Sequence, residues 1–257
     1  MKTSITSTYR PPLLRAVYAF LIAITALSAM PRNAHAQIYV TQVNGIINPI
    51  GFVNEYDASS GTLIKDHLIT GLKTPTGLVV TGNTLFVANR DSGTVGAYDA
   101  TSGTGNASFI TGLSGPTGLA VAGNTLFVAS SGTTGVGTVG AYNAGTGAAI
   151  NPNPLITALN GPTGLAVTGN TLFVATEGNA TVGEYNATSG TAINATFITL
   201  QTEVTGLAVS TKGNVLFVGN FFGGTVGEYD AKMGSTINAG FIKNLVFPAG
   251  IAIKAAK

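Results

Sequence analysis

One sequence unit recurs about every 43 residues from residue 37 onward. Its clearest marker, Pro-Thr-Gly-Leu, begins at Pro75, Pro116 and Pro162, and weaker copies begin at Val204 and Pro248. A tyrosine keeps the same period, at Tyr56, Tyr98, Tyr142, Tyr185 and Tyr229. A fixed period of this length indicates a repeat architecture, in which each unit completes its hydrophobic core only against its neighbours.

Each unit contains four short runs rich in β-branched and aromatic residues, separated by turns of Gly, Asn, Asp and Thr. In the copy that starts at Gly164, these runs are residues 164–167, 171–175, 181–185 and 196–200. Four antiparallel strands in 40 to 45 residues are typical of one blade of a β-propeller. A β-solenoid is the structural alternative, but its coils are usually about half this long.

The strand count predicts five blades and the way in which the ring closes. If the four strands of a blade are named a to d from the axis outward, residues 38–40 align with a strand b, and residues 249–253 form a last strand a. We therefore predict an all-β, five-bladed β-propeller of four-stranded antiparallel blades. Its C-terminal strand a, residues 250–253, would pair beside residues 38–41 and join the N-terminal strands b to d. This pairing would cover an open inner edge.

Residues 1–36 have the pattern of a secretory signal peptide. Lys2, Arg10 and Arg15 precede an apolar run at 16–30, and an Ala-x-Ala pattern ends at Ala36. The alternative is a membrane anchor, but a 15-residue run would span only about 22 Å of a hydrocarbon core about 30 Å thick. We expect one propeller domain, residues 37–257, that is secreted or periplasmic and has no membrane span after cleavage.

Charge and cysteine content exclude several functions. The segment 1–36 holds four of the 12 basic residues and none of the 10 acidic ones, so its removal changes the formal net charge from +2 to −2. A domain with so few basic residues is not expected to bind nucleic acid. Because the chain has no cysteine, it has no disulfide, thiolate zinc site or cysteine nucleophile.

The unit P-T-G-L-A-V-x-G-N-T-L-F-V-A, followed by T-V-G-x-Y-[DN]-A, resembles the NHL-type and related secreted bacterial propeller repeats. The resemblance implies that Gly-Leu-Ala-Val is strand a and that Phe-Ile-Thr is strand d. It also implies that the connections from strand d to strand a and from strand b to strand c lie on one face. The absence of tryptophan excludes the Trp-Asp blade signature.

Histidines and most carboxylates have structural interpretations. His35 leaves with the signal peptide and His67 falls on a predicted outermost strand, so we find no imidazole placed for a catalytic triad. One repeat position alternates between Asp and Asn, which predicts side chains that cap their own turns, at Asp57, Asp99, Asn143, Asn186 and Asp230. A neighbouring position carries glutamates that we expect on solvated faces, at Glu55, Glu184 and Glu228.

The candidate ligand-binding residues are the non-repetitive ones on the face with the d-to-a and b-to-c connections. They are Arg90, Asp91, Glu177, Glu203, Asn220, Phe221 and Phe222. Two lengthened b-to-c connections, residues 45–50 and 131–135, project from the same face. The adjacent phenylalanines form a plausible contact pair; the alternative is that one of them plugs the axial channel, or that these are plain surface loops.

These observations favour a secreted, non-catalytic propeller that acts as a binding or scaffold module. We expect a monomer without a cofactor, whose partner is an unidentified protein, glycan or small molecule. By resemblance to gluconolactonase-like and streptogramin-lyase-like propellers, the alternative is a calcium-assisted hydrolase or lyase. Its oxygen ligands would come from Asp91, Glu177, Glu203 and Asn220. The lyase resemblance is weakened because such enzymes rely on histidine and residues 37–257 contain only His67.

Overall fold

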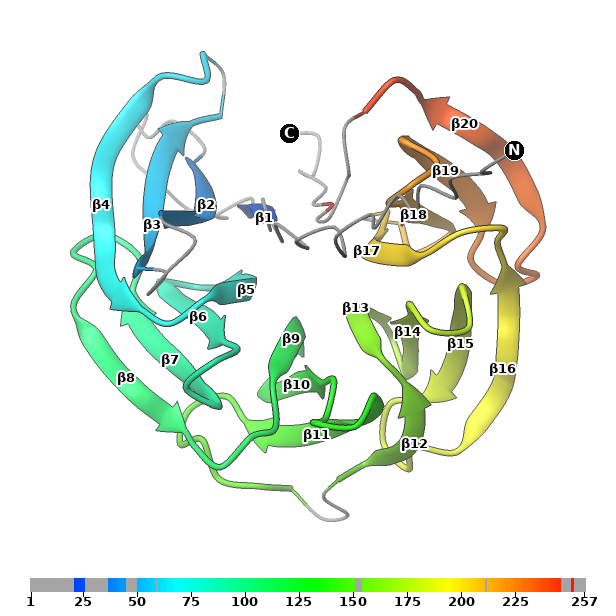
Figure 1. The fold of residues 1–257 in the computed structure, drawn as a ribbon, viewed down its shortest axis with the longest axis horizontal. Helices are drawn as coiled ribbons and strands as arrows, with labels where there is room; N and C mark the ends of the chain where they lie inside the picture. The colour runs from blue at the N-terminus through cyan, green and yellow to red at the C-terminus, as the bar shows by residue number, and fades with distance from the viewer. Residues whose placement is uncertain are drawn as a thin grey trace, which may run out of the picture.

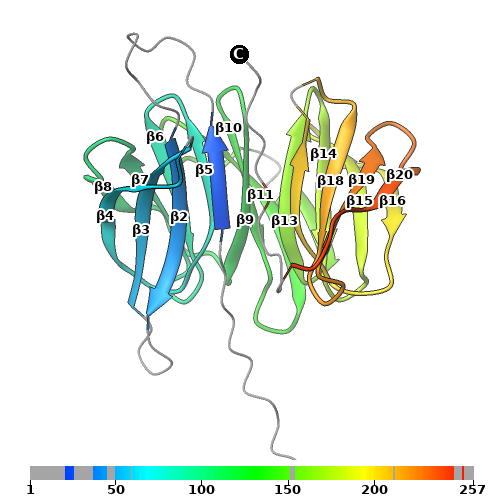
Figure 2. The ribbon, with the colours of Figure 1, turned by 90° about the horizontal axis from the view of Figure 1, so that it is seen from above.

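Five antiparallel sheets of four strands stand around a central axis in the computed structural model (Figure 1). Seen from its side, the ring is a flat disc whose strands run between two faces (Figure 2). The structure describes residues 21–25, 37–44, 50–58, 60–150, 154–210, 212–245 and 251. Within these ranges no helix is long and apolar enough to cross a membrane. The predicted five-bladed, all-β architecture is confirmed.

Each blade runs from an innermost strand a to an outermost strand d. The a strands are β1 (Leu21–Thr25), β5 (Pro75–Thr81), β9 (Pro116–Ala122), β13 (Pro162–Thr168) and β17 (Val204–Val209). The b strands are β2 (Gln37–Asn44), β6 (Thr84–Asn89), β10 (Thr125–Ser130), β14 (Thr171–Thr176) and β18 (Val215–Asn220). The c strands are β3 (Ile50–Asp57), β7 (Thr94–Asp99), β11 (Val136–Asn143), β15 (Thr181–Asn186) and β19 (Thr225–Asp230). The d strands are β4 (Leu63–Leu72), β8 (Gly105–Ile110), β12 (Ile156–Asn160), β16 (Ala192–Thr199) and β20 (Thr236–Ile242).

The hydrophobic core lies between neighbouring blades. In β6, β10 and β14, every residue after the first is buried, because each of these strands has a blade on both sides. One core cluster joins Phe86 of the second blade to Leu119 and Tyr142 of the third. The nearly continuous apolar runs in the sequence therefore report burial on both faces.

The repeated Pro-Thr-Gly-Leu motif joins each blade to the next. The Thr76 hydroxyl donates to the carbonyl oxygen of Pro116 at 2.9 Å, and the Thr117 hydroxyl donates to that of Pro162 at 2.8 Å. Thr163 continues the series with a 3.0 Å bond to the carbonyl oxygen of Val204. Each threonine thus satisfies a backbone acceptor at the start of the following strand a.

The glycine of the same motif allows the strands to come this close. A Cβ atom on Gly77 would lie 2.0 Å from the carbonyl oxygen of Thr117, and one on Gly118 would lie 2.1 Å from that of Thr163. No side chain fits at such distances from rigid backbone atoms. The motif is therefore a joint made of one hydrogen bond and one close backbone contact.

The alternating Asp and Asn residues cap the c-to-d turns, as predicted. The Oδ1 atom of Asp99 accepts hydrogen bonds from the backbone N–H groups of Thr101 and Ser102 at 3.0 and 2.7 Å. Asn143 makes the same pair of bonds to Gly145 and Thr146. Because these bonds hold the pKa of Asp99 below its ordinary value, the carboxylate stays ionised where it caps.

The strand that completes the first blade differs from the prediction. β1 pairs antiparallel with β2, from Leu21 opposite Thr41 to Thr25 opposite Gln37. Residues 250–253 were predicted at this edge; all of them except Ile251 lie outside the described residues. Both segments contain Ile-Ala-Ile, so they share the apolar, β-branched pattern of a strand a.

Candidate ligand-binding face

The d-to-a and b-to-c connections lie on the same face of the disc. In the second blade, Pro75 at the start of β5 pairs with Asn89 at the end of β6. The same pairing of a first and a last residue occurs in the fourth blade between Pro162 and Thr176. We call this side of the ring the connection face. Antiparallel pairing brings every residue that follows a strand b next to the connection that precedes the strand a of its blade.

One backbone hydrogen bond recurs on the connection face in four blades. The residue directly after strand b donates its N–H to a carbonyl oxygen in the d-to-a connection, at 2.9 to 3.1 Å. The donors are Arg90, Ser131, Glu177 and Phe221, and the acceptors are Thr74, Gly115, Gly161 and Glu203. Since the main chain alone makes this bond, the side chain at the position can vary without cost to the scaffold.

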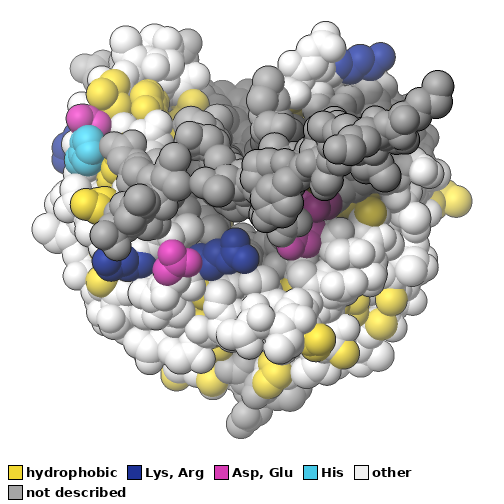
Figure 3. Space-filling model, in the orientation of Figure 1, with side chains coloured by type: hydrophobic (Ala, Val, Ile, Leu, Met, Phe, Trp, Pro, Cys, Tyr) yellow, Lys and Arg dark blue, Asp and Glu magenta, His cyan; other side chains and the backbone are white. Residues whose placement is uncertain are grey.

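Arg90 and Asp91 occupy this position and the next in the second blade, and both are exposed. The hydroxyl of Thr74 donates to the carboxylate of Asp91 and holds it against the d-to-a connection. The Arg90 side chain extends toward the third blade, where a Cβ on Gly115 would lie 3.9 Å from its Cγ. Figure 3 shows that charged side chains form only a few small groups on this view of the molecule.

Glu177 lies over a glycine of its own blade. A Cβ on Gly161 would come within 2.8 Å of the Glu177 Cγ, and Gly161 has a φ of +60°, so this glycine makes room for the glutamate. Beside it, Asn160 donates to Asn179 at 2.9 Å and fastens the turn. Glu177 is half-buried, which restricts the directions that its carboxylate can take.

The fifth blade brings together the other four predicted residues. Asn220 accepts hydrogen bonds from the Thr202 hydroxyl and from the backbone N–H of Gly223, and the N–H of Phe221 donates to the carbonyl oxygen of Glu203. The rings of Phe221 and Phe222 pack edge to face, with centroids 5.1 Å apart. Phe222 is 61% exposed and Phe221 is half-buried, so the pair presents one open aromatic ring.

A cavity of about 380 Å³ between the fourth and fifth blades was not foreseen. Its lining includes Phe197, Gln201, Asn220, Thr225 and Tyr229. Asn220 lines the cavity and also caps the turn that carries Phe221 and Phe222. This residue therefore connects the cavity with the aromatic pair. The only sequence signal was the irregular d-to-a connection of the fifth blade, where Val204 replaces the usual proline.

The predicted carboxylates stand on three different blades. Across the described ranges, no three Asp, Glu, His or Cys side chains gather into a group that could hold a metal ion. Calcium binding by Asp91, Glu177, Glu203 and Asn220 stays a prediction.

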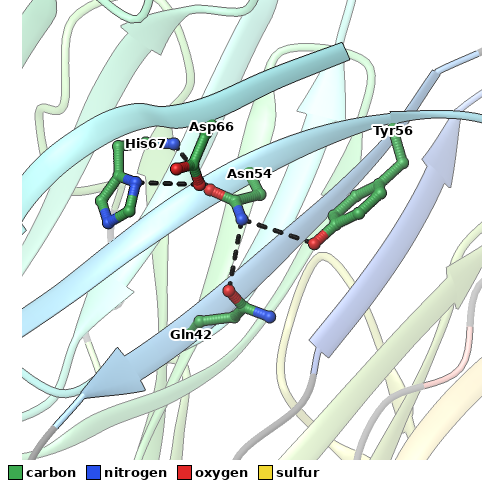
Figure 4. A network of polar contacts seen from close by, with 5 residues as sticks. All are labelled: Gln42, Asn54, Tyr56, Asp66 and His67. Atoms are coloured by element: carbon green, nitrogen blue, oxygen red, sulfur yellow. Dashed lines mark hydrogen bonds and ion pairs between the residues drawn. The ribbon is translucent and has the colours of Figure 1, made fainter. Parts of the chain in front are cut away.

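His67 is an edge residue on β4, as the sequence indicated. Its ring stacks on Phe52 at a centroid distance of 4.0 Å. Its Nδ1 lies 2.8 Å from the carboxylate of Asp66, a contact that Figure 4 shows. Its backbone N–H donates to the buried side chain of Asn54, which in turn donates to Gln42. These contacts hold β4, the strand d of the first blade, against its strand c, β3. They give His67 a structural role.

Glu55 was wrongly expected to be solvated. Its side chain is only 2% exposed, and Gln37 donates to it from β2. Burial raises the pKa of Glu55 above its ordinary value, and the nearby charge of Lys65 offsets part of the rise. The same repeat position is half-buried in Glu184 and Glu228, so the sequence register alone could not reveal this difference.

Comparison with known proteins identifies the fold. No family model and no curated protein matches the chain. A chain of the nidogen/laminin complex has a TM-score of 0.72 and 15% identity, covering 90% of this chain and 84% of that one. XC5397 from Xanthomonas campestris, described as a gluconolactonase, has a TM-score of 0.69 and 15% identity, covering 92% and 80%. The computationally designed Ika8 protein has a TM-score of 0.55 and 20% identity, covering 91% and 66%.

At these identities the likeness shows the propeller fold alone. The narrower resemblance to NHL-type repeats is not confirmed by a family model.

Proposed function

We propose that the protein is a secreted or periplasmic, monomeric and non-catalytic propeller that binds a partner through its connection face. The supporting observation is that Arg90, Ser131, Glu177 and Phe221 make the same backbone bond yet have four unlike side chains. Positions with a purely structural task behave differently here: the c-to-d turns use only Asp or Asn. Unlike side chains at equivalent loop positions of a regular scaffold are typical of recognition surfaces.

The aromatic pair of the fifth blade is the proposed centre of contact. An exposed ring such as Phe222 offers a large contact area at a small cost in side-chain entropy, and the Phe221 ring supports it edge to face. A planar apolar surface of this kind suits a sugar ring or an apolar side chain of a peptide. The class of partner is therefore a glycan or a protein segment, with the cavity between the fourth and fifth blades as the site for a small-molecule alternative.

A glycan array and a peptide array should identify a binder for residues 37–257, and calorimetry should give its affinity. Replacing Phe221 and Phe222 with Ser should weaken binding by at least about 30-fold, which corresponds to a hot spot of about 2 kcal/mol. The matched control is Met233→Ser, which removes an apolar side chain that is 78% exposed on the c-to-d turn of the same blade.

The outcomes separate the interpretations. If the double variant unfolds, the phenylalanines belong to the core; if binding survives in a folded variant, the aromatic pair is not the contact. Titration with calcium chloride tests the enzyme alternative, because a stoichiometric heat of binding that is lost in Glu177→Gln would favour a calcium-assisted hydrolase or lyase.

A further inference from the structure

The cavity between the fourth and fifth blades has a lining that suits a particular class of ligand. We propose that it binds one neutral sugar ring, either a free monosaccharide or the end unit of a glycan chain. This inference deepens the proposed function, because it rests on a binding role and names the ligand class of the cavity. The volume of about 380 Å³ falls within the range of small-molecule sites.

The fourth blade has an unusual d-to-a connection at this cavity. In the other four blades, the leucine near the end of strand d follows a residue with a positive φ, and these residues are Gly71, Gly112, Ala158 and Asn244. In the fourth blade, Leu200 directly follows Thr199, and its N–H donates to the carbonyl oxygen of Ala180 at 2.9 Å. One more residue than usual then precedes strand a. Gln201, the residue after this leucine, is exposed and lines the cavity.

Tyr229 gives the cavity a buried polar group. Its ring lies over Gly227, where a Cβ would come within 2.7 Å of the ring, and the residue is only 4% exposed. In the described parts of the chain, no group is hydrogen-bonded to the Tyr229 hydroxyl. A buried hydroxyl without a partner costs free energy until a water molecule or a ligand supplies one.

A difference at one repeat position leaves this hydroxyl available. Asn89 ends β6 in the second blade, and Asn220 ends β18 in the fifth. Burial raises the pKa of Tyr98, and a hydrogen bond with the Asn89 side chain lowers it, whereas burial alone raises the pKa of Tyr229. The Asn220 side chain instead accepts hydrogen bonds from the d-to-a connection and from the turn of its own blade. The asparagine that bonds to the tyrosine in one blade is therefore engaged elsewhere in the other.

The rest of the lining selects a neutral ligand with hydroxyl groups around a compact body. Among the described residues that line the cavity, none is charged, so an ionised ligand would lose its hydration without gaining a partner. Phe197 and Val218 are buried and form an apolar wall, while polar side chains come from different segments, at Gln201, Thr225 and Thr236. A sugar ring has an apolar face and hydroxyl groups around its rim. An extended peptide would instead need a strand edge for its backbone groups.

Saturation-transfer NMR on the full chain with glucose, galactose and mannose tests the proposal. At least one of these sugars should bind, with a dissociation constant on the order of 1 mM for a ligand of this size. Glucuronate should bind at least about tenfold more weakly than glucose, because its carboxylate would be buried without a partner. A trisaccharide of the sugar that binds identifies the source: tighter binding than the free sugar indicates a glycan end, and equal or weaker binding indicates a free monosaccharide.

Tyr229→Phe removes only the hydroxyl and should weaken sugar binding by about tenfold. Its melting temperature should stay unchanged, because no described group is bonded to that hydroxyl. The matched control is Tyr185→Phe, which changes the same repeat position in the core between the third and fourth blades and should leave binding unchanged. Gln201→Ala is a second test at an exposed position, where the fold is not at risk, and should weaken binding by about threefold.

The proposal is overturned if none of the three neutral sugars binds to the folded protein, or if Tyr229→Phe and Tyr185→Phe bind them equally well. Sugar binding that is lost in Phe222→Ser but kept in Tyr229→Phe would place the ring on the aromatic pair. That result contradicts a cavity site and leaves the proposed function standing. A sugar that binds in the cavity while no array partner needs the aromatic pair would have the opposite meaning.

Discussion

The repeated glycine of the Pro-Thr-Gly-Leu motif sets how closely two blades approach. Replacing Gly118 with Ala would place a Cβ 2.1 Å from the carbonyl oxygen of Thr163, which cannot yield without moving the next blade. We expect the free energy of unfolding to fall by about 2 to 3 kcal/mol, measured by urea denaturation.

Gly145→Ala is the matched control, because its new Cβ would meet neighbouring atoms at 3.4 Å and beyond. Its effect should stay within about 0.5 kcal/mol, as for an ordinary surface substitution. Equal stability of the two variants would show that the blade joint is not close-packed.

The buried carboxyl of Glu55 should make stability depend on pH. Because burial raises its pKa, the folded protein holds this proton to a higher pH than the unfolded chain does. The stability that results is complete below the ordinary glutamate value of 4.5 and is lost as the pH rises through the raised pKa. Relative to Glu55→Gln, the wild type should therefore lose stability as the pH rises above 4.5.

The urea midpoints of the wild type and of Glu55→Gln, measured at a series of pH values, give the difference in stability between the two proteins. Subtracting one curve from the other removes the titration of all other groups. Parallel curves would mean that Glu55 has the same pKa in the folded and unfolded chains. The burial of Glu55 could not be predicted from the sequence register because Gln37, which donates to its carboxyl group, belongs to a different strand.

At the scale of the element, the c-to-d turns carry a stabilising contact of their own. Asn143→Ala removes the acceptor for the N–H groups of Gly145 and Thr146 and should cost about 1 kcal/mol of unfolding free energy. Asn143→Asp keeps an acceptor and should cost less, since Asp99 makes the same bonds in the second blade. A thermal melt of the three proteins decides; an Ala variant as stable as the Asp variant would contradict the capping role.

Strands and turns were predictable because their signals are local. Turn residues and runs of β-branched side chains bound each strand, and the period gives the number of blades. Side-chain directions on the connection face were not predictable: Arg90 reaches toward Gly115 and Glu177 lies over Gly161, and both depend on the backbone of another connection. The face could be inferred from the strand order, but not the gathering of Glu203, Asn220 and the two phenylalanines on one blade.

At the scale of the whole molecule, the ring needs a strand at the inner edge of β2. Deleting residues 246–257 from a chain that begins at Gln37 should leave that edge open and give an unfolded or aggregating product. The same deletion in the full chain should keep a cooperative melt, because β1 covers the edge. Circular dichroism melts of the four proteins test this; an unchanged melting temperature in the shorter, deleted chain would contradict closure by the C-terminal strand.

The strand count predicts that the C-terminal segment completes the first blade, whereas β1 holds that position in the structure. Two segments carry Ile-Ala-Ile, and the pattern of strand a fits both. Only the pairing of β1 with β2 shows that the leader segment can occupy the position.

The threonine joint between blades also has a direction, since Thr76, Thr117 and Thr163 each donate forward along the chain. Head-to-tail contacts of this kind either close on themselves or continue from molecule to molecule. A chain whose first blade still lacks its inner strand can close onto its own fifth blade or pair with the fifth blade of another copy. We therefore expect dilute refolding to give single rings and concentrated refolding to give strand-swapped polymers, with the speed of self-closure setting the concentration at which one outcome replaces the other.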